Sequence, residues 1–211
     1  MRPLTVITLL LALPCAALAA TPAAKDDDFE PDEPLRSLAL GPLPRARAMV
    51  SGDVGWLRSG IGIGVGLGAA LDLVLRIDAM PLYEKGLGGQ RELQGGLRFS
   101  PIAEEDLRLT VQVTGGQVFI SKPAELVSFT TVRGEILLGA TFDLLSPYAR
   151  LGVRTMSRNV EGADAWQREE EIGLGVERVL GRFVVGAEGY VLARPHRSGM
   201  GQWRLRVGYA L

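Results

Sequence analysis

The sharpest candidate for nucleophilic chemistry in this sequence is the motif His196-Arg197-Ser198. Its histidine and serine are two residues apart, so on an extended strand they would face the same side. A histidine beside a serine hydroxyl could act as its base and make it a nucleophile. However, no Asp or Glu follows Glu188, so no downstream carboxylate is available to orient the histidine. We therefore interpret this motif as a polar loop.

The same motif resembles the His-x-Ser of outer-membrane lipid A deacylases, which are β-barrels whose serine attacks an acyl ester with the histidine as base. Those enzymes place Asn after the serine, whereas Gly199 follows it here. The resemblance implies a lipid-modifying hydrolase with His196 as the base and Ser198 as the nucleophile. We keep this function as an alternative. Our principal expectation is that the chain has no catalytic residues and is not an enzyme.

A run of alternating glycines could be mistaken for a phosphate-binding loop. These glycines alternate within a predicted strand, lead into no helix and lack the Lys-Ser/Thr ending of such loops. We interpret them instead as making room for long arginine side chains in a cramped interior. The glycines concerned are Gly62, Gly64, Gly66 and Gly68.

The remaining candidates for ligand binding are weaker. The acids Glu169–Glu171, near Trp166, are most simply the solvated rim of an external loop, and a contact with a divalent cation or lipopolysaccharide is the alternative. With one histidine and one cysteine, His196 and Cys15, a Cys/His zinc site is excluded. We therefore expect no metal and no cofactor. The formal net charge of −1 argues against a nucleic-acid partner.

Residues 1–19 have the pattern of a signal peptide. An apolar run extends from Val6 to Leu13, and Ala17-Leu18-Ala19 fits a signal-peptidase site. The run is too short for a membrane-spanning helix, which needs about 20 apolar residues. Pro14 before Cys15 disfavours attachment of a lipid at that cysteine. We expect export and a mature chain without cysteine.

We interpret residues 20–45 as an acidic, proline-rich periplasmic arm that is disordered. The stretch contains six acids and five prolines, so it can bury little apolar surface. Alternatively, the arm could plug a basic lumen or hold a periplasmic partner.

From Ala46 onward, polar and apolar residues alternate with a period of two, which predicts β-strands rather than helices. We predict about ten strands, with eight as the alternative, because most segments are near the roughly 9–11 residues that a tilted strand needs to cross a bilayer. The predicted strands are 46–57, 60–69, 72–83, 90–99, 106–119, 128–142, 147–156, 168–178, 182–193 and 202–211.

The segment from Ile61 to Ala79 keeps one alternating phase and could form a single strand. That strand would extend over about 60 Å, twice a bilayer core, and would make the strand number odd. We therefore predict a turn near Ala69-Ala70. With an even number of strands, the shorter connections face the periplasm and the longer ones face outward. Arg58-Ser59 is the exception, a tight external turn.

The positions of the aromatic residues favour a membrane barrel over a soluble one. On the apolar face they fall at the predicted strand ends, while the strand centres are aliphatic. Two aromatic girdles around an aliphatic band are typical of a wall that faces lipid, whereas a soluble core has large rings centrally. The external girdle is Trp56, Tyr83, Phe119 and Trp203, and the periplasmic girdle is Phe99, Phe142, Phe183 and Tyr209.

The last residues, Trp203–Leu211, alternate up to the carboxyl terminus. They resemble the C-terminal strand of bacterial outer-membrane β-barrels, except that the family pattern prefers a terminal Phe where this chain has Leu211. The resemblance implies a Gram-negative outer membrane, insertion by the barrel-assembly machinery, and contact with outer-membrane lipid and lipopolysaccharide. The predicted fold is all-β, a closed antiparallel up-and-down transmembrane barrel over residues 46–211.

The predicted inward face carries equal numbers of arginines and acids. Side chains largely fill a barrel of about eight to ten strands, so we expect these charges to pair in a buried network. We therefore predict a non-enzymatic structural or adaptor protein with a plugged lumen and an envelope-complex partner. A narrow pore for small solutes is the alternative.

Arg204 and Arg206 should pair with acids of neighbouring strands, such as Asp53. The nine arginines are Arg47, Arg76, Arg98, Arg108, Arg133, Arg150, Arg154, Arg204 and Arg206, and the nine acids are Asp53, Asp72, Asp78, Glu92, Glu135, Glu169, Glu171, Glu177 and Glu188.

Overall fold

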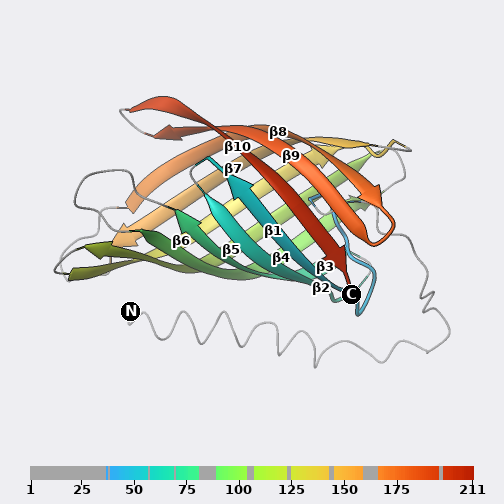
Figure 1. Cartoon of the computed structure of the whole chain (residues 1–211), viewed down its shortest axis with the longest axis horizontal. Coiled ribbons are helices and arrows are strands. Elements are labelled where there is room, and N and C mark those ends of the chain that lie inside the picture. Colours follow the sequence, from blue (N-terminus) through green and yellow to red (C-terminus); the bar gives the residue numbers. More distant parts are fainter. Residues whose placement is uncertain are drawn as a thin grey trace.

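The computed structural model describes residues 37, 39–56, 58–68, 70–80, 89–103, 107–122, 125–142, 145–158, 166–194 and 197–211. In these residues ten antiparallel strands form a closed barrel (Figure 1). The strands are β1 (Ala48–Gly55), β2 (Ser59–Gly66), β3 (Leu71–Met80), β4 (Gln90–Ala103), β5 (Arg108–Lys122), β6 (Glu125–Gly139), β7 (Ser146–Arg158), β8 (Trp166–Leu180), β9 (Phe183–Arg194) and β10 (Arg197–Ala210).

Each strand pairs with its neighbours in the sequence, and β1 closes the ring by pairing with β10. The register of this closing pair runs from Met49 opposite Ala210 to Gly55 opposite Arg204. The predicted closed up-and-down barrel of ten strands is thus confirmed. We call the end at which β1 begins and β10 finishes the turn end, and the opposite end the loop end. Within the described residues, no helix is long and apolar enough to cross a membrane.

The predicted break in the longest alternating segment is also confirmed. β2 ends at Gly66 and β3 begins at Leu71, and the Leu67 N–H donates to the Leu71 carbonyl (2.8 Å). At the loop end, several strands extend further than predicted; the β5–β6 ladder continues to Lys122 opposite Glu125. Backbone pairing needs no apolar side chain, so the ladder continues where the alternating pattern fades.

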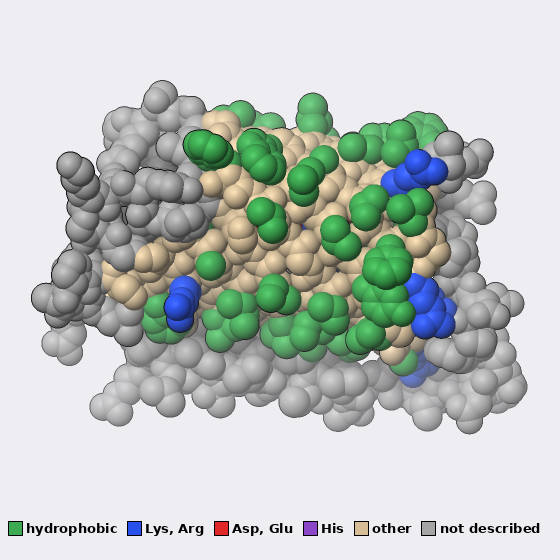
Figure 2. Space-filling model, viewed as in Figure 1, with side chains coloured by type: hydrophobic (Ala, Val, Ile, Leu, Met, Phe, Trp, Pro, Cys, Tyr) green, Lys and Arg blue, Asp and Glu red, His purple; other side chains and the backbone are tan. Residues whose placement is uncertain are grey.

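The outer wall of the barrel is apolar, the reverse of a soluble protein. Leu174 is 70% exposed and Ile61 is 65% exposed, although both lie in strands that are paired on both sides. Figure 2 shows apolar side chains over the visible wall, with basic side chains toward its two ends. Such a surface is stable only against lipid or another apolar partner.

Aromatic side chains mark both ends of this wall. Phe99, Phe142 and Phe183 are exposed at the turn end, and Trp56 is exposed at the loop end. Trp203 lies in the middle of β10, level with the end of β1. The Trp56 N–H donates a hydrogen bond to the carbonyl of Trp203 (3.2 Å). Tyr83 of the predicted external girdle lies outside the described residues.

Candidate functional site

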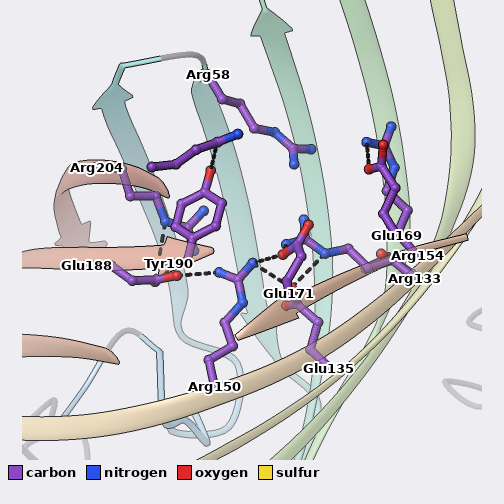
Figure 3. Close-up of polar contacts among 12 residues, drawn as sticks. Arg58, Arg133, Glu135, Arg150, Arg154, Glu169, Glu171, Glu188, Tyr190 and Arg204 are labelled. Carbon is purple, nitrogen blue, oxygen red and sulfur yellow. Dashed lines mark hydrogen bonds and ion pairs between the residues drawn. The ribbon is translucent and has the colours of Figure 1, made fainter. Parts of the chain in front are cut away.

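The interior of the barrel is filled by charged side chains that pair across it, and this lumen is the candidate functional site (Figure 3). All nine acids that the alternation placed on the inward face are buried. A charge removed from water costs several kcal/mol unless opposite charges and hydrogen bonds replace the lost solvent. In the lumen, the described arginines and acids provide these opposite charges and hydrogen bonds for one another.

Glu188 of β9 joins several strands at the centre of the lumen. Its Oε1 accepts a hydrogen bond from Arg150 Nη1 (2.6 Å), and its Oε2 accepts from Arg204 Nη2 (2.8 Å) and the Tyr148 hydroxyl (2.8 Å). Both guanidiniums also lie near the ring of Tyr190, with their Cζ atoms 5.4 and 5.6 Å from its centroid. The expected pairing of Arg204 with an acid of a neighbouring strand is confirmed.

A second group of ion pairs connects β6, β7 and β8. Arg133 lies 2.6 Å from Glu135 Oε1 and also contacts Glu171. Arg150 contacts the same two acids, Glu135 at 3.1 Å. Because each of these four groups has at least two opposite partners, the network resists local rearrangement. Through Arg150 it continues to Glu188, as the dashed lines of Figure 3 show.

Arg58, which we predicted in a tight external turn, points inward and closes the loop end of the lumen. Its Nη2 lies 2.5 Å from Asp78 Oδ2 and 2.9 Å from Glu92 Oε2, and its side chain is 6% exposed. Burial disfavours the charged form, but the carboxylates of Asp78 and Glu92 outweigh burial and hold the pKa of Arg58 above its ordinary value. Arg154 Nη2 donates to the same Glu92 oxygen (2.9 Å), so both arginines share this acid.

Asp53 of β1 pairs with a different arginine from the one expected. It lies opposite Arg206 in the sheet, yet its carboxylate binds Arg76 of β3. Arg206 instead reaches Glu177 at 3.4 Å and Glu188 at 3.6 Å. A long arginine side chain can reach acids on several strands, so strand adjacency alone did not identify this pair.

The turn end of the lumen is closed by the described part of the predicted arm. Residues 37 and 39–45, called the plug segment below, enter the barrel before β1 begins, and Leu40 and Leu43 are almost fully buried there. The plug segment thus belongs to the end of the predicted arm, residues 20–45. The alternative for the arm was that it plugs a basic lumen, but the plug segment contains none of the arm's acids. The rest of the arm and the predicted signal peptide lie outside the described residues.

Two acids of the barrel hold backbone N–H groups of the plug segment. Glu177 Oε2 accepts hydrogen bonds from the Ser37 hydroxyl (2.7 Å) and the Ala39 N–H (3.0 Å). Asp72 Oδ1 accepts from the Leu43 N–H (2.9 Å). Hydrogen bonds to a charged acceptor are stronger than neutral ones, so these carboxylates anchor both ends of the segment.

The carbonyl groups of the plug segment are held from β5. The Thr110 hydroxyl donates to the Leu40 carbonyl (2.6 Å), and Arg108 Nη1 donates to the Gly41 carbonyl (2.8 Å). Gly41 itself has a φ of +39°, and a Cβ there would lie 2.9 Å from Arg98 Nε. The positive φ therefore favours glycine at this position, and a Cβ would also displace the guanidinium of Arg98.

The alternating glycines of β2 make room for the plug segment. A Cβ at Gly66 would lie 2.2 Å from the Pro44 carbonyl oxygen, and one at Gly64 would lie 3.1 Å from Leu43 Cδ1. The cramped interior that we expected is thus confirmed at these positions. The prediction that arginine side chains fill this space is wrong at these two positions, because the plug segment occupies it.

The substitution Gly66→Ala is expected to displace the plug segment, because the added methyl group would overlap the backbone at Pro44. On a semi-native gel, where the folded barrel runs as a separate band, we expect the temperature at which this band is lost to fall. The fall should be equivalent to about 1–3 kcal/mol of stability. Gly68→Ala is the matched control, since nothing lies within 4 Å of a Cβ there. Equal midpoints for the two variants would contradict this role of Gly66.

A cavity of about 100 Å³ remains next to the plug segment, bordered by Ala39, Gln94, Thr114 and Arg150 among other residues. This volume holds about three water molecules and is well below the roughly 300–1,000 Å³ of typical ligand pockets. The lumen therefore has space for a few waters rather than for a substrate.

The other candidate residues do not form a site in the described chain. His196 lies outside the described residues, and Ser198 belongs to β10, with its side chain outside them. Glu169 and Glu171 are buried in the lumen, whereas Glu170 faces outward and pairs with Arg168 (2.8 Å), so the three acids are not one solvated rim. Within the described ranges, no His, Cys, Asp and Glu side chains gather to hold a metal ion.

Comparisons with known proteins show the fold. No family model and no curated protein matches the sequence. Among solved structures, the β domain of the Bordetella autotransporter BrkA matches 78% of this chain and 97% of its own, at 14% identity and a TM-score of 0.51. The N-terminal barrel of Pseudomonas aeruginosa OprF matches 79% and 98% at 13% identity and a TM-score of 0.40. OmpT, an outer membrane protein of Vibrio cholerae, matches 74% and 56% at 11% identity and a TM-score of 0.38.

At these identities the likeness concerns architecture alone. The chain has the fold of bacterial outer-membrane β-barrels.

Proposed function

We propose that this chain is a non-enzymatic structural or adaptor component of the outer membrane whose lumen is closed to solutes. The observation that carries this proposal is the set of buried ion pairs across the lumen. The plug segment, which fills the turn end, supports it. A buried charge that loses its partner destabilises a protein by about 3–5 kcal/mol, so opening a conducting path through several ion pairs is strongly unfavourable.

The two ends of the lumen are closed by different means. At the loop end, Arg58 and Arg154 bind the same oxygen of Glu92 across the opening. At the turn end, the plug segment buries Leu40 and Leu43 inside the barrel mouth. Closure at both ends favours a plugged barrel over the narrow pore.

The proposal is tested by single-channel recording of the purified barrel in planar bilayers. We expect no steady current above that of the lipid alone, because buried ion pairs cross the lumen. Heat-dependent mobility on a semi-native gel serves as the control that the inserted protein is folded. A steady open current from folded protein would contradict the closed lumen and favour the pore.

We further propose that the barrel-assembly machinery inserts the chain and that its acidic arm meets a basic periplasmic partner. The six acids between Asp26 and Glu33 precede the plug segment in the sequence. Hydrogen bonds to Glu177 and Asp72 hold the plug segment at the turn end. The turn end is periplasmic in barrels of this architecture.

A further inference from the structure

A hollow runs along β9 on the lipid-facing wall. The outward residues of β9 are small here, Ala187 and Gly189, and the register places each between two larger side chains. The flanking residues are Leu174 and Val176 of β8 and Trp203 and Leu205 of β10. The resulting groove, called the β9 groove below, has a volume of about 430 Å³ and apolar walls.

Two exposed arginines lie toward the turn end of the β9 groove. Arg178 is the next outward residue of β8 after Val176, and Arg182 lies in the turn between β8 and β9. Arg178 is opposite Val185, whereas the exposed aromatic Phe183 is two residues nearer the turn end. The backbone of Arg178 therefore lies on the lipid side of the aromatic girdle.

The charged head of Arg178 is unfavourable in the hydrocarbon core of a bilayer. A guanidinium on the lipid face costs about 2–4 kcal/mol at the bilayer midplane and little near the interface. Its apolar stem can lie along the wall while the head extends to the level of the phosphates. Phosphate oxygens match the two parallel N–H donors of a guanidinium. The chemistry at the mouth of the groove thus fits a phosphate, and the chemistry along it fits an acyl chain.

We propose that the β9 groove, together with Arg178 and Arg182, binds an anionic phospholipid. The phosphate contacts the two arginines, and one acyl chain occupies the hollow over Ala187 and Gly189. A lipid without a phosphate would use only the groove, and a free phosphate would use only the arginines, whereas an anionic phospholipid uses both. A zwitterionic phospholipid binds more weakly, because the two arginines repel its choline cation. The site does not depend on whether the lumen conducts, so a failure of the bilayer recording leaves it unaffected.

The charged half of the site is tested by native mass spectrometry of the full barrel in detergent. The protein is titrated with phosphatidylglycerol and, separately, with phosphatidylcholine carrying the same chains. We expect one phosphatidylglycerol to bind about tenfold more tightly, and the double variant Arg178→Gln with Arg182→Gln to lose that preference. Arg91→Gln, which removes an exposed arginine of β4 at the loop end, is the control and should keep it.

The apolar half is tested by filling the groove with Gly189→Leu, which should weaken binding of both lipids. A Cβ at Gly189 has its nearest neighbour at 3.9 Å, so this variant should fold. Gly134→Leu places the same side chain on β6, where nothing lies within 4 Å of a Cβ, and should bind lipid normally. The proposal is overturned if phosphatidylcholine binds as tightly as phosphatidylglycerol, or if either the double arginine variant or Gly189→Leu retains full phosphatidylglycerol binding.

Discussion

The variant Glu188→Ala is expected to lose about 3–5 kcal/mol of unfolding free energy, because it leaves buried positive charges without their shared partner. Glu188 is 5% exposed and accepts hydrogen bonds from Arg150, Arg204 and the Tyr148 hydroxyl. Arg150 keeps Glu135 and Glu171, but Arg204 loses the carboxylate that it binds directly. The loss of stability should therefore come mainly from Arg204.

Urea unfolding of the refolded barrel in lipid vesicles, followed by tryptophan fluorescence, measures this loss. Glu188→Gln keeps a hydrogen-bond acceptor without the charge, so we expect an intermediate value. Leu174→Ala is the control, because Leu174 faces lipid from the neighbouring strand and its truncation leaves no buried charge. A change below about 1 kcal/mol for Glu188→Ala would show that water or relaxed arginines replace the carboxylate.

Residue alternation was sufficient to predict the wall of the barrel. The inward acids were found because a period of two assigns every second residue of a strand to one side, and a one-residue error would reverse the whole strand. The break between β2 and β3 followed from a length limit, since one strand over Ile61–Ala79 would exceed the bilayer. Both inferences depend on properties that are local in the sequence.

The features that were missed depend on contacts distant in the sequence. Arg58 sits in a turn, where no periodicity tells whether a side chain points into the lumen, and its partners Asp78 and Glu92 lie on other strands. The plug segment was hidden because its proline content is typical of a linker. The one sequence signal that could have found it is the glycine run of β2, whose missing side chains require something else to fill the space.

Removal of residues 20–45 is expected to open the lumen to reagents from the turn end. The mature chain is predicted to lack cysteine, so Thr114→Cys introduces a single thiol beside the cavity next to the plug segment. Thr114 is 4% exposed in the intact barrel. We expect a charged, membrane-impermeant thiol reagent to modify this cysteine about a hundredfold faster in the truncated protein, because an undocking cost of about 3 kcal/mol no longer protects it.

The docked plug segment is held by the burial of Leu40 and Leu43 and by its hydrogen bonds to Glu177 and Asp72. Arg182→Cys, in the exposed turn between β8 and β9, is the control and should be modified at the same rate with or without the arm. Gly66→Ala in the full-length protein should give an intermediate rate at Thr114→Cys, since it weakens docking without removing the segment. If the truncated and intact proteins react equally fast at that position, the plug segment does not seal the lumen in solution, and the ion pairs alone must account for its closure.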